Sequence, residues 1–141
     1  MLLFLMFAIS LWLVHTYPYL LKGFLGGATA NVVLNYALKA LTRESRPHLS
    51  PNEAFYGAQK YGMPSGHAQT AFFFAAFVYF ATANLPAAGL LLCLSAACLM
   101  QRYMNHYHTA MQLIAGSVVG VLMAYWAVHI ARTQRARQDS G

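Results

Sequence analysis

Residues 64–83 read PSGHAQTAFFFAAFVYFATA, and this stretch decides the class of fold. It contains no Asp, Glu, Lys or Arg, and from Ser65 onward it is long and apolar enough to cross a bilayer, which takes roughly 17 to 25 mostly apolar residues. Its first turn carries Ser65 and His67. The stretch therefore predicts a membrane-spanning helix that begins at a polar site.

The composition of the whole chain agrees with a membrane protein. Of the 141 residues, 59% are hydrophobic and 9% are charged, and the mean hydropathy is +0.46. Water-soluble domains usually carry about 25% charged residues, so this chain has too few charged residues to cover the surface of a soluble domain. The length is that of a single domain.

Four more apolar segments surround the first one. We expect an all-α fold, a polytopic membrane helix bundle of about five transmembrane helices, at residues 2–21, 24–41, 65–83, 87–101 and 108–130. The first segment is interrupted by His15, Thr16 and Pro18, and it has no preceding basic residue, which favours a retained helix over a signal peptide. Residues 42–63 are expected to form a loop with room for one short helix. The predicted division is a membrane-embedded domain at 1–131 and a basic polar tail at 132–141.

Three short polar runs stand out, at residues 39–47, 64–67 and 102–108. If all five segments span the membrane, these runs lie on the same side, which predicts one composite active site at one membrane face. The opposite side would then hold four cations, Lys22, Arg132, Arg135 and Arg137. Positive residues favour the cytoplasm, so the site is expected on the lumenal or extracellular side.

The second run has the features of an anion site. Ser65 is a good N-cap, and the free N–H groups and dipole at a helix N-terminus attract anions. Gly66 lets the backbone approach a ligand, and His67 is placed to donate a proton to a leaving oxygen. An ordinary capped helix start with an interfacial histidine would explain the same residues.

The other two runs supply cations and a second imidazole. Lys39 and Arg46 could hold phosphate oxygens or simply reach for lipid headgroups. His108 is a candidate nucleophile, with Arg102 before it, and Gln112 one helical turn later as the acceptor for its second ring nitrogen. His106 competes with His108, whereas the remaining histidines are interpreted as interfacial or incidental: His15, His48 and His129.

The scarcity of acidic residues decides the class of chemistry. The chain has three Asp and Glu in total, and only Glu44 and Glu53 lie outside the tail. Magnesium sites usually gather carboxylates, so we expect no metal and no cofactor, with cations and helix dipoles stabilising the transition state. A nucleic-acid partner is not expected, because no binding motif accompanies the net charge of +6. Cys93 and Cys98 are interpreted as structural, reduced thiols.

At this point the pattern resembles the type 2 phosphatidic acid phosphatase superfamily, which also includes vanadium haloperoxidases. Its first motif is a lysine, six residues and Arg-Pro, matched by Lys39 and Arg46-Pro47; its second is Pro-Ser-Gly-His, matched at 64–67. Its third, an arginine, five residues and a histidine, is matched by Arg102 and His108. The resemblance implies that His108 is the phosphate-accepting nucleophile and His67 the general acid. It implies that the phosphate is held by Lys39, Arg46, Ser65, Gly66 and Arg102.

One departure from that family points to a branch within it. Nearly all members have an aspartate four residues after the nucleophile, where this chain has Gln112. A glutamine there, the run Tyr61-Gly62-Met63-Pro64 and Ala68-Gln69 are similar to the dolichyl diphosphatase branch, although that branch commonly has serine in place of Gly66. This branch implies hydrolysis of dolichyl diphosphate to dolichyl phosphate and phosphate, at the lumenal face of the endoplasmic reticulum, for N-glycosylation.

Two alternatives remain open. The chain could be another lipid phosphatase of the superfamily, acting on undecaprenyl diphosphate at a bacterial plasma membrane, on phosphatidate or on a sphingoid phosphate. It could also be a non-catalytic membrane protein that binds phosphorylated lipid, with Gln112 marking lost activity. The natural lipid and the oligomeric state are not determined by the motifs.

Overall fold

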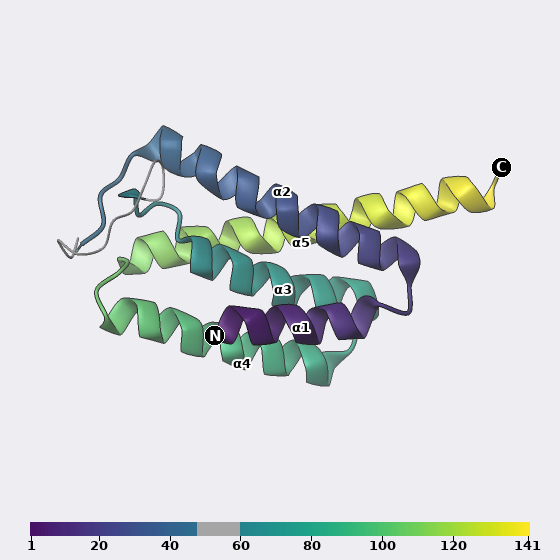
Figure 1. The fold of residues 1–141 in the computed structure, drawn as a ribbon, viewed down its shortest axis with the longest axis horizontal. Helices are drawn as coiled ribbons and strands as arrows, with labels where there is room; N and C mark the ends of the chain where they lie inside the picture. Colours follow the sequence, from purple (N-terminus) through teal and green to yellow (C-terminus); the bar gives the residue numbers. More distant parts are fainter. Residues whose placement is uncertain (48–59) are drawn as a thin grey trace.

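The computed structural model describes residues 1–47 and 60–141, which form five α-helices in an elongated bundle (Figure 1). Within this part of the chain there is no β-strand, so the predicted all-α class is confirmed. The helices are α1 (Leu2–Val14), α2 (Pro18–Thr42), α3 (Gly66–Thr82), α4 (Leu85–Met104) and α5 (Ala110–Asp139).

Two of these helices, α4 and α5, are long and apolar enough to cross a membrane by length and composition. Helix α1 is apolar but shorter, with 13 residues. The count of about five transmembrane helices therefore stays a prediction. Helix α5 continues through the expected tail as far as Asp139, so residues 132–139 are helical.

The first predicted segment, residues 2–21, is wrong as a single helix. Helix α1 ends at Val14, and α2 begins at Pro18 after Tyr17, whose backbone is extended at φ −113° and ψ 95°. Proline has no N–H to donate within a helix and disfavours helical geometry in the residue before it, but it is well suited to the first helical position. The chain therefore turns at Pro18, and Lys22 lies inside α2 rather than in a loop.

Helix α3 occupies the centre of the bundle and contacts each of the other four helices (Figure 1). Its middle carries phenylalanines that are closely packed against Phe24 of α2, with ring centroids 6.1 Å from Phe73 and 5.2 Å from Phe77. These three rings are fully buried. Burial of such apolar surface is the main term that holds α2 against α3 in the interior of the bundle.

Two glycines allow α5 to lie directly against α3. A Cβ atom at Gly116 would overlap the carbonyl oxygen of Ser65, and one at Gly120 would overlap the carbonyl oxygen of Gln69. Backbones approach this closely only where a side chain is missing. The contact brings the N-terminal ends of α3 and α5 together, where the backbone N–H of Ser65 donates to the carbonyl oxygen of Gln112 at 2.9 Å.

The arrangement places three chain segments at the same end of the bundle. Figure 1 shows the end of α2, the start of α3 and the connection from α4 to α5 at one end, and the C-terminus of α5 at the other. All three polar runs of the sequence belong to that first end. The middle of the predicted 42–63 loop, including His48 and Glu53, lies outside the described residues.

Gly120→Ala is expected to lower the free energy of unfolding by about 1–3 kcal/mol, because the added methyl group separates α3 from α5. Gly89→Ala in α4 is the matched control, since nothing lies within 4 Å of a Cβ there. That control should be neutral or stabilise by up to about 1 kcal/mol, because glycine weakens a helix. Thermal unfolding in detergent measures both, and equal effects would contradict the close α3–α5 contact.

Candidate active site

A polar face of α2 points into the bundle and reaches the site. Asn31, Asn35 and Lys39 follow one another at intervals of four residues and are all buried, so this row of side chains faces inward. Gln69 of α3 donates to the side chain and carbonyl oxygen of Asn31 at 2.9 and 2.8 Å, and accepts from Asn35 at 2.8 Å. Buried amides that satisfy one another in this way lock α2 and α3 in register.

Lys39 is fully buried in the last turn of α2, and its Nζ donates to the carbonyl oxygen of Tyr61 at 2.5 Å. This bond uses one of the three donors of the ammonium group. A lysine that merely reached for headgroups would be exposed at the helix end. Lys39 is instead held inside the protein, at the segment that leads into α3.

The start of α3 is built as the sequence indicates. Ser65 is fully buried and is the N-cap, and its Oγ accepts from the backbone N–H of Ala68 at 3.4 Å. A Cβ atom at Gly66 would lie 3.0 Å from the side-chain oxygen of Asn35, so the absence of a side chain matters there. A helix N-terminus leaves its first N–H groups without partners inside the helix, and an anion is favoured there.

His67 lies in the first turn of α3 and is paired with Arg102. An Nη2 hydrogen of Arg102 points to Nε2 of His67, which acts as the acceptor. Arg102 lies in the last turn of α4 and not in the predicted connection. Its Nε is buried and has no hydrogen-bond partner among residues 1–47 and 60–141. A phosphate oxygen is the kind of acceptor that such a donor lacks.

His108 is buried in the connection between α4 and α5 and is held through both ring nitrogens. Its Nδ1 is 3.0 Å from Oε1 of Gln112, and its Nε2 is 3.3 Å from Nη1 of Arg46. The amide oxygen and the guanidinium assign the tautomer: Nδ1 carries the proton, and Nε2 carries the lone pair. The nitrogen that could attack phosphorus therefore faces the arginine.

The pKa of His108 is lowered from its usual 6.5 to about 4, chiefly by burial and to a smaller extent by the nearby cations Arg46 and Lys39. The hydrogen bond to Gln112 acts in the opposite direction. His108 is consequently neutral across the physiological pH range. A neutral imidazole with an available lone pair is what a nucleophile requires.

Sequence reasoning missed Glu44, which follows α2 and reaches Gln112. The carboxylate oxygen Oε1 of Glu44 accepts from Nε2 of Gln112 at 2.7 Å, and the same nitrogen donates to the carbonyl oxygen of Ser45 at 3.0 Å. One signal was available, because Glu44 is among only three acidic residues and lies two positions before Arg46.

Three other histidines lie in the described part of the chain. His106, the competing nucleophile, is exposed and has a backbone φ of +55°. His129 stacks on the ring of Tyr125 in α5, with centroids 6.3 Å apart, and His15 bonds the carbonyl oxygen of Trp12. Cys93 is exposed and Cys98 is buried, and both are free.

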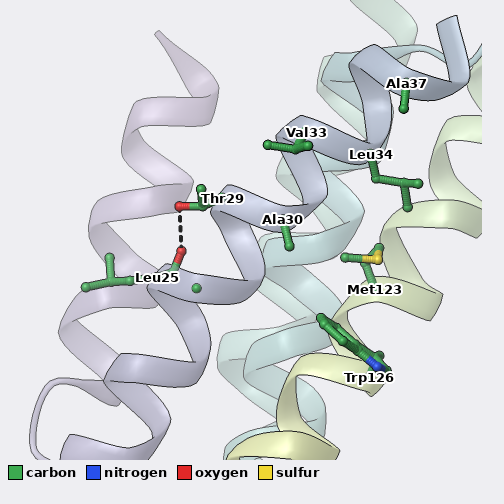
Figure 2. Close-up of a pocket in the computed structure, with 9 residues that line it drawn as sticks. Leu25, Thr29, Ala30, Val33, Leu34, Ala37, Met123 and Trp126 are labelled. Atoms are coloured by element: carbon green, nitrogen blue, oxygen red, sulfur yellow. Dashed lines mark hydrogen bonds between the residues drawn. The ribbon is translucent and has the colours of Figure 1, made fainter.

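Two cavities bear on the function. One of ≈ 520 Å³ adjoins His108 and is also lined by Pro47, Tyr103 and His106. A larger one of ≈ 880 Å³ lies between α2 and α5, away from the cations, with apolar walls that include Val33 and Trp126 (Figure 2). We place the candidate chemistry at the smaller cavity, because a phosphoryl group needs donors and the larger cavity offers almost none.

The hydroxyl group of Thr29, which lines the larger cavity, is already hydrogen-bonded. Thr29 Oγ1 donates to the carbonyl oxygen of Leu25 within α2 at 2.9 Å, as the dashed line in Figure 2 shows. An apolar chain fits such a surface better than a charged group does.

Comparison with protein families matches residues 2–136 to the PAP2 superfamily. The chain belongs to the PAP2 superfamily. This result confirms the resemblance drawn from the three motifs. The PAP2 fold is a membrane fold, which agrees with the apolar helices of the bundle.

Curated relatives of this PAP2 protein carry the name Dolichyldiphosphatase 1. The protein from Mus musculus is 35% identical over 117 residues, which is 72% of this chain and 48% of the relative. The human protein is 33% identical over the same length, and that of Dictyostelium discoideum is 33% identical over 102 residues, 64% of this chain and 43% of the relative. The chain thus spans about half the length of the curated relatives it matches. No solved structure matches.

The ring of His108 is expected to titrate near pH 4, well below 6.5, because burial and adjacent cations disfavour its charged form. Arg46→Gln removes one cation and should raise this midpoint. NMR of the ¹⁵N-histidine-labelled protein measures both, with His108→Gln to assign the signal. A wild-type midpoint near 6.5 would contradict a buried, cation-lined imidazole.

Proposed function

We propose that this PAP2 protein is a metal-independent membrane lipid phosphatase that hydrolyses a polyprenyl diphosphate, of the dolichyl type, to the monophosphate and inorganic phosphate. One observation carries the proposal: Gln112 holds Nδ1 of His108, while Nε2 keeps its lone pair beside Arg46. His108 is thus a nucleophile with the cations Arg46, Lys39 and Arg102 around it. Such an arrangement suits a multiply charged phosphate.

In the first step, Nε2 of His108 attacks the terminal phosphorus. The new N–P bond forms as the P–O bond to the leaving lipid monophosphate breaks, and a protonated His67 gives its proton to that oxygen. In the second step, His67 takes a proton from water, whose oxygen attacks phosphorus. The N–P bond breaks, inorganic phosphate leaves, and His108 regains its lone pair.

Donors from three segments suit the charge that develops on the phosphoryl oxygens. We assign Lys39 and Arg46 to one side of the group, Arg102 to another, and the N–H groups after Ser65 and Gly66 to the helix N-terminus. In the structure the two arginines donate to the rings of His108 and His67. Phosphate oxygens would accept from the same guanidinium groups and leave each imidazole free to react.

The proposal that the substrate is a lipid is supported by the apolar surroundings of the site and by the names of the relatives. The cavity between α2 and α5 is lined by apolar groups, and two helices have the length and composition of membrane spans. The relatives' name, Dolichyldiphosphatase 1, favours a dolichyl diphosphate over other lipid phosphates. Its product would be a carrier lipid recycled for N-glycosylation.

The expected location is the endoplasmic reticulum membrane, with the site on the lumenal side. Lys22 lies near the start of α2 and Arg132, Arg135 and Arg137 lie near the end of α5, at the end of the bundle opposite the cationic site (Figure 1). This distribution favours a cytoplasmic position for that end. In a bacterial cell the same orientation would apply to the plasma membrane.

Phosphate release from dolichyl diphosphate by the detergent-purified protein in chelator tests the proposal. We expect release from the diphosphate in preference to dolichyl phosphate, undecaprenyl diphosphate, phosphatidate and a sphingoid phosphate. His108→Ala should lower kcat by at least about a thousandfold, because the nucleophile is lost. His106→Ala is the matched control and should retain activity.

Each contrary result has a defined meaning. Preference for phosphatidate or a sphingoid phosphate would keep the chemistry and change the substrate. A requirement for added Mg²⁺ would contradict the metal-free mechanism, and exchanged results for the two histidine variants would move the nucleophile to His106. Binding of phosphorylated lipid without any release would support the non-catalytic alternative.

A further inference from the structure

The side-chain amide of Gln112 forms hydrogen bonds through all its polar positions. Its oxygen accepts from Nδ1 of His108 at 3.0 Å and from the backbone N–H of Thr109 at 3.3 Å. Its nitrogen donates to Oε1 of Glu44 at 2.7 Å and to the carbonyl oxygen of Ser45 at 3.0 Å. Gln112 is fully buried, so its amide relies on protein partners, although Glu44 and Ser45 are themselves exposed.

Two of the four partners are backbone groups, and they determine which way the amide faces. The N–H of Thr109 can only donate and the carbonyl of Ser45 can only accept, so the oxygen must point toward Thr109 and His108. The orientation of Gln112 is therefore set without Glu44. What Glu44 adds at this position is a negative charge.

From this geometry we propose that Glu44 is a positioning residue for the reaction, whose carboxylate acts on His108 through the amide of Gln112. The proposal rests on the proposed function, because it concerns the same nucleophile. The carboxylate of Glu44 supplies the negative charge that Gln112 itself does not carry. The chain of contacts runs from Nδ1–H of His108 to Oε1 of Gln112, and from Nε2–H of Gln112 to Oε1 of Glu44.

The charge matters during attack. When the Nε2 lone pair forms the N–P bond and the P–O bond to the leaving group breaks, the imidazole ring becomes positive and keeps its proton on Nδ1. A carboxylate bonded to the amide N–H polarises the amide and increases the negative charge on its oxygen, because consecutive hydrogen bonds strengthen one another. That oxygen then stabilises the positive ring more than an isolated amide would.

The segment around Glu44 is held by its backbone. The backbone N–H of Gly62 donates to the carbonyl oxygen of Glu44 at 2.7 Å, and a Cβ atom at Gly62 would lie 2.5 Å from the Gln112 amide. Gly62 thus covers the amide closely. Substitution of the Glu44 side chain leaves the backbone bond in place, so its effect on turnover reports the carboxylate.

The first test is steady-state kinetics of Glu44→Gln in the full chain with dolichyl diphosphate. This variant keeps an acceptor for Gln112 and loses the charge, so kcat should fall by about tenfold to a hundredfold, as for other outer partners of reacting groups. KM should stay within about twofold of wild type, since among the described residues the side chain of Glu44 bonds Gln112 and none of the phosphate-binding donors.

Arg43→Gln is the matched control. Arg43 is the neighbouring residue, is exposed, and its Nε donates to the carbonyl oxygen of Ala40 within the same segment. The substitution also changes the net charge by one unit, in the opposite direction, so unchanged kcat there shows that a charge change in this segment does not by itself lower turnover. A kcat for Glu44→Gln equal to that of Arg43→Gln would overturn the proposal.

Exchange of the two side chains gives a rescue test. Gln112→Glu alone places two carboxylates together and should be strongly impaired. The double variant Glu44→Gln with Gln112→Glu restores one amide and one carboxylate in reverse order, with the charge directly at Nδ1 of His108. Its kcat should exceed that of Gln112→Glu by at least about tenfold. Failure to recover in a folded double variant would overturn the coupling.

The proton on Nδ1 of His108 provides a readout that needs no turnover. Its NMR resonance in the wild-type protein should lie downfield, as expected for a polarised hydrogen bond, and should move upfield in Glu44→Gln but not in Arg43→Gln. If the wild-type protein releases no phosphate from any lipid, the proposed function fails. The resonance shift still tests whether Glu44 acts on His108 through Gln112. An unmoved resonance would overturn the role of Glu44 even in an active enzyme.

Discussion

Gln112 is the residue on which the arrangement of the site depends. Its carbonyl oxygen accepts from the N–H of Ser65, and its side chain binds His108 on one side and Glu44 on the other. These contacts join the starts of α3 and α5 to the segment after α2. Because a buried amide is stable only when all its donors and acceptors are engaged, a change in any of these segments disturbs the others.

The close contact between α3 and α5 makes this junction possible. Gly116 and Gly120 remove the side chains that would otherwise hold the two backbones apart, and both face the first half of α3. On the other side of α3, Gln69 ties the helix to Asn31 and Asn35 of α2. The central helix is therefore fixed from both sides near the end that carries Ser65 and His67.

The clustering of cations in the candidate site lowers the stability of the folded protein. Lys39 is fully buried, Arg46 and Arg102 are half-buried, and the two arginines donate to the rings of His108 and His67. Like charges close together in an apolar bundle reduce stability, and a polyanion relieves that repulsion. Stability given up in this way is commonly found where a site is prepared for ligand or transition-state charge.

Much of the site was predictable because its parts obey local rules. Motif residues at the end of one helix and the start of the next must meet when consecutive helices alternate in direction, so Lys39, His67 and His108 were expected together. Helical spacing also predicted that Gln112 accepts from His108, one turn away. The boundary at Pro18 was missed because the apolar composition continues across it, although the proline that ends the first segment was visible.

The amino-acid sequence by itself determined the all-helical class, the family and the donors and imidazoles of the candidate site, because these follow from composition, periodicity and motif spacing. Only the tertiary structure decided which ring nitrogen of His108 is protonated, which way the Gln112 amide faces, and that Glu44 stands behind it. Those features depend on bonds between residues up to 68 positions apart, as between Glu44 and Gln112. No local pattern encodes such a pair, since the packing of α2 against α5 brings its members together.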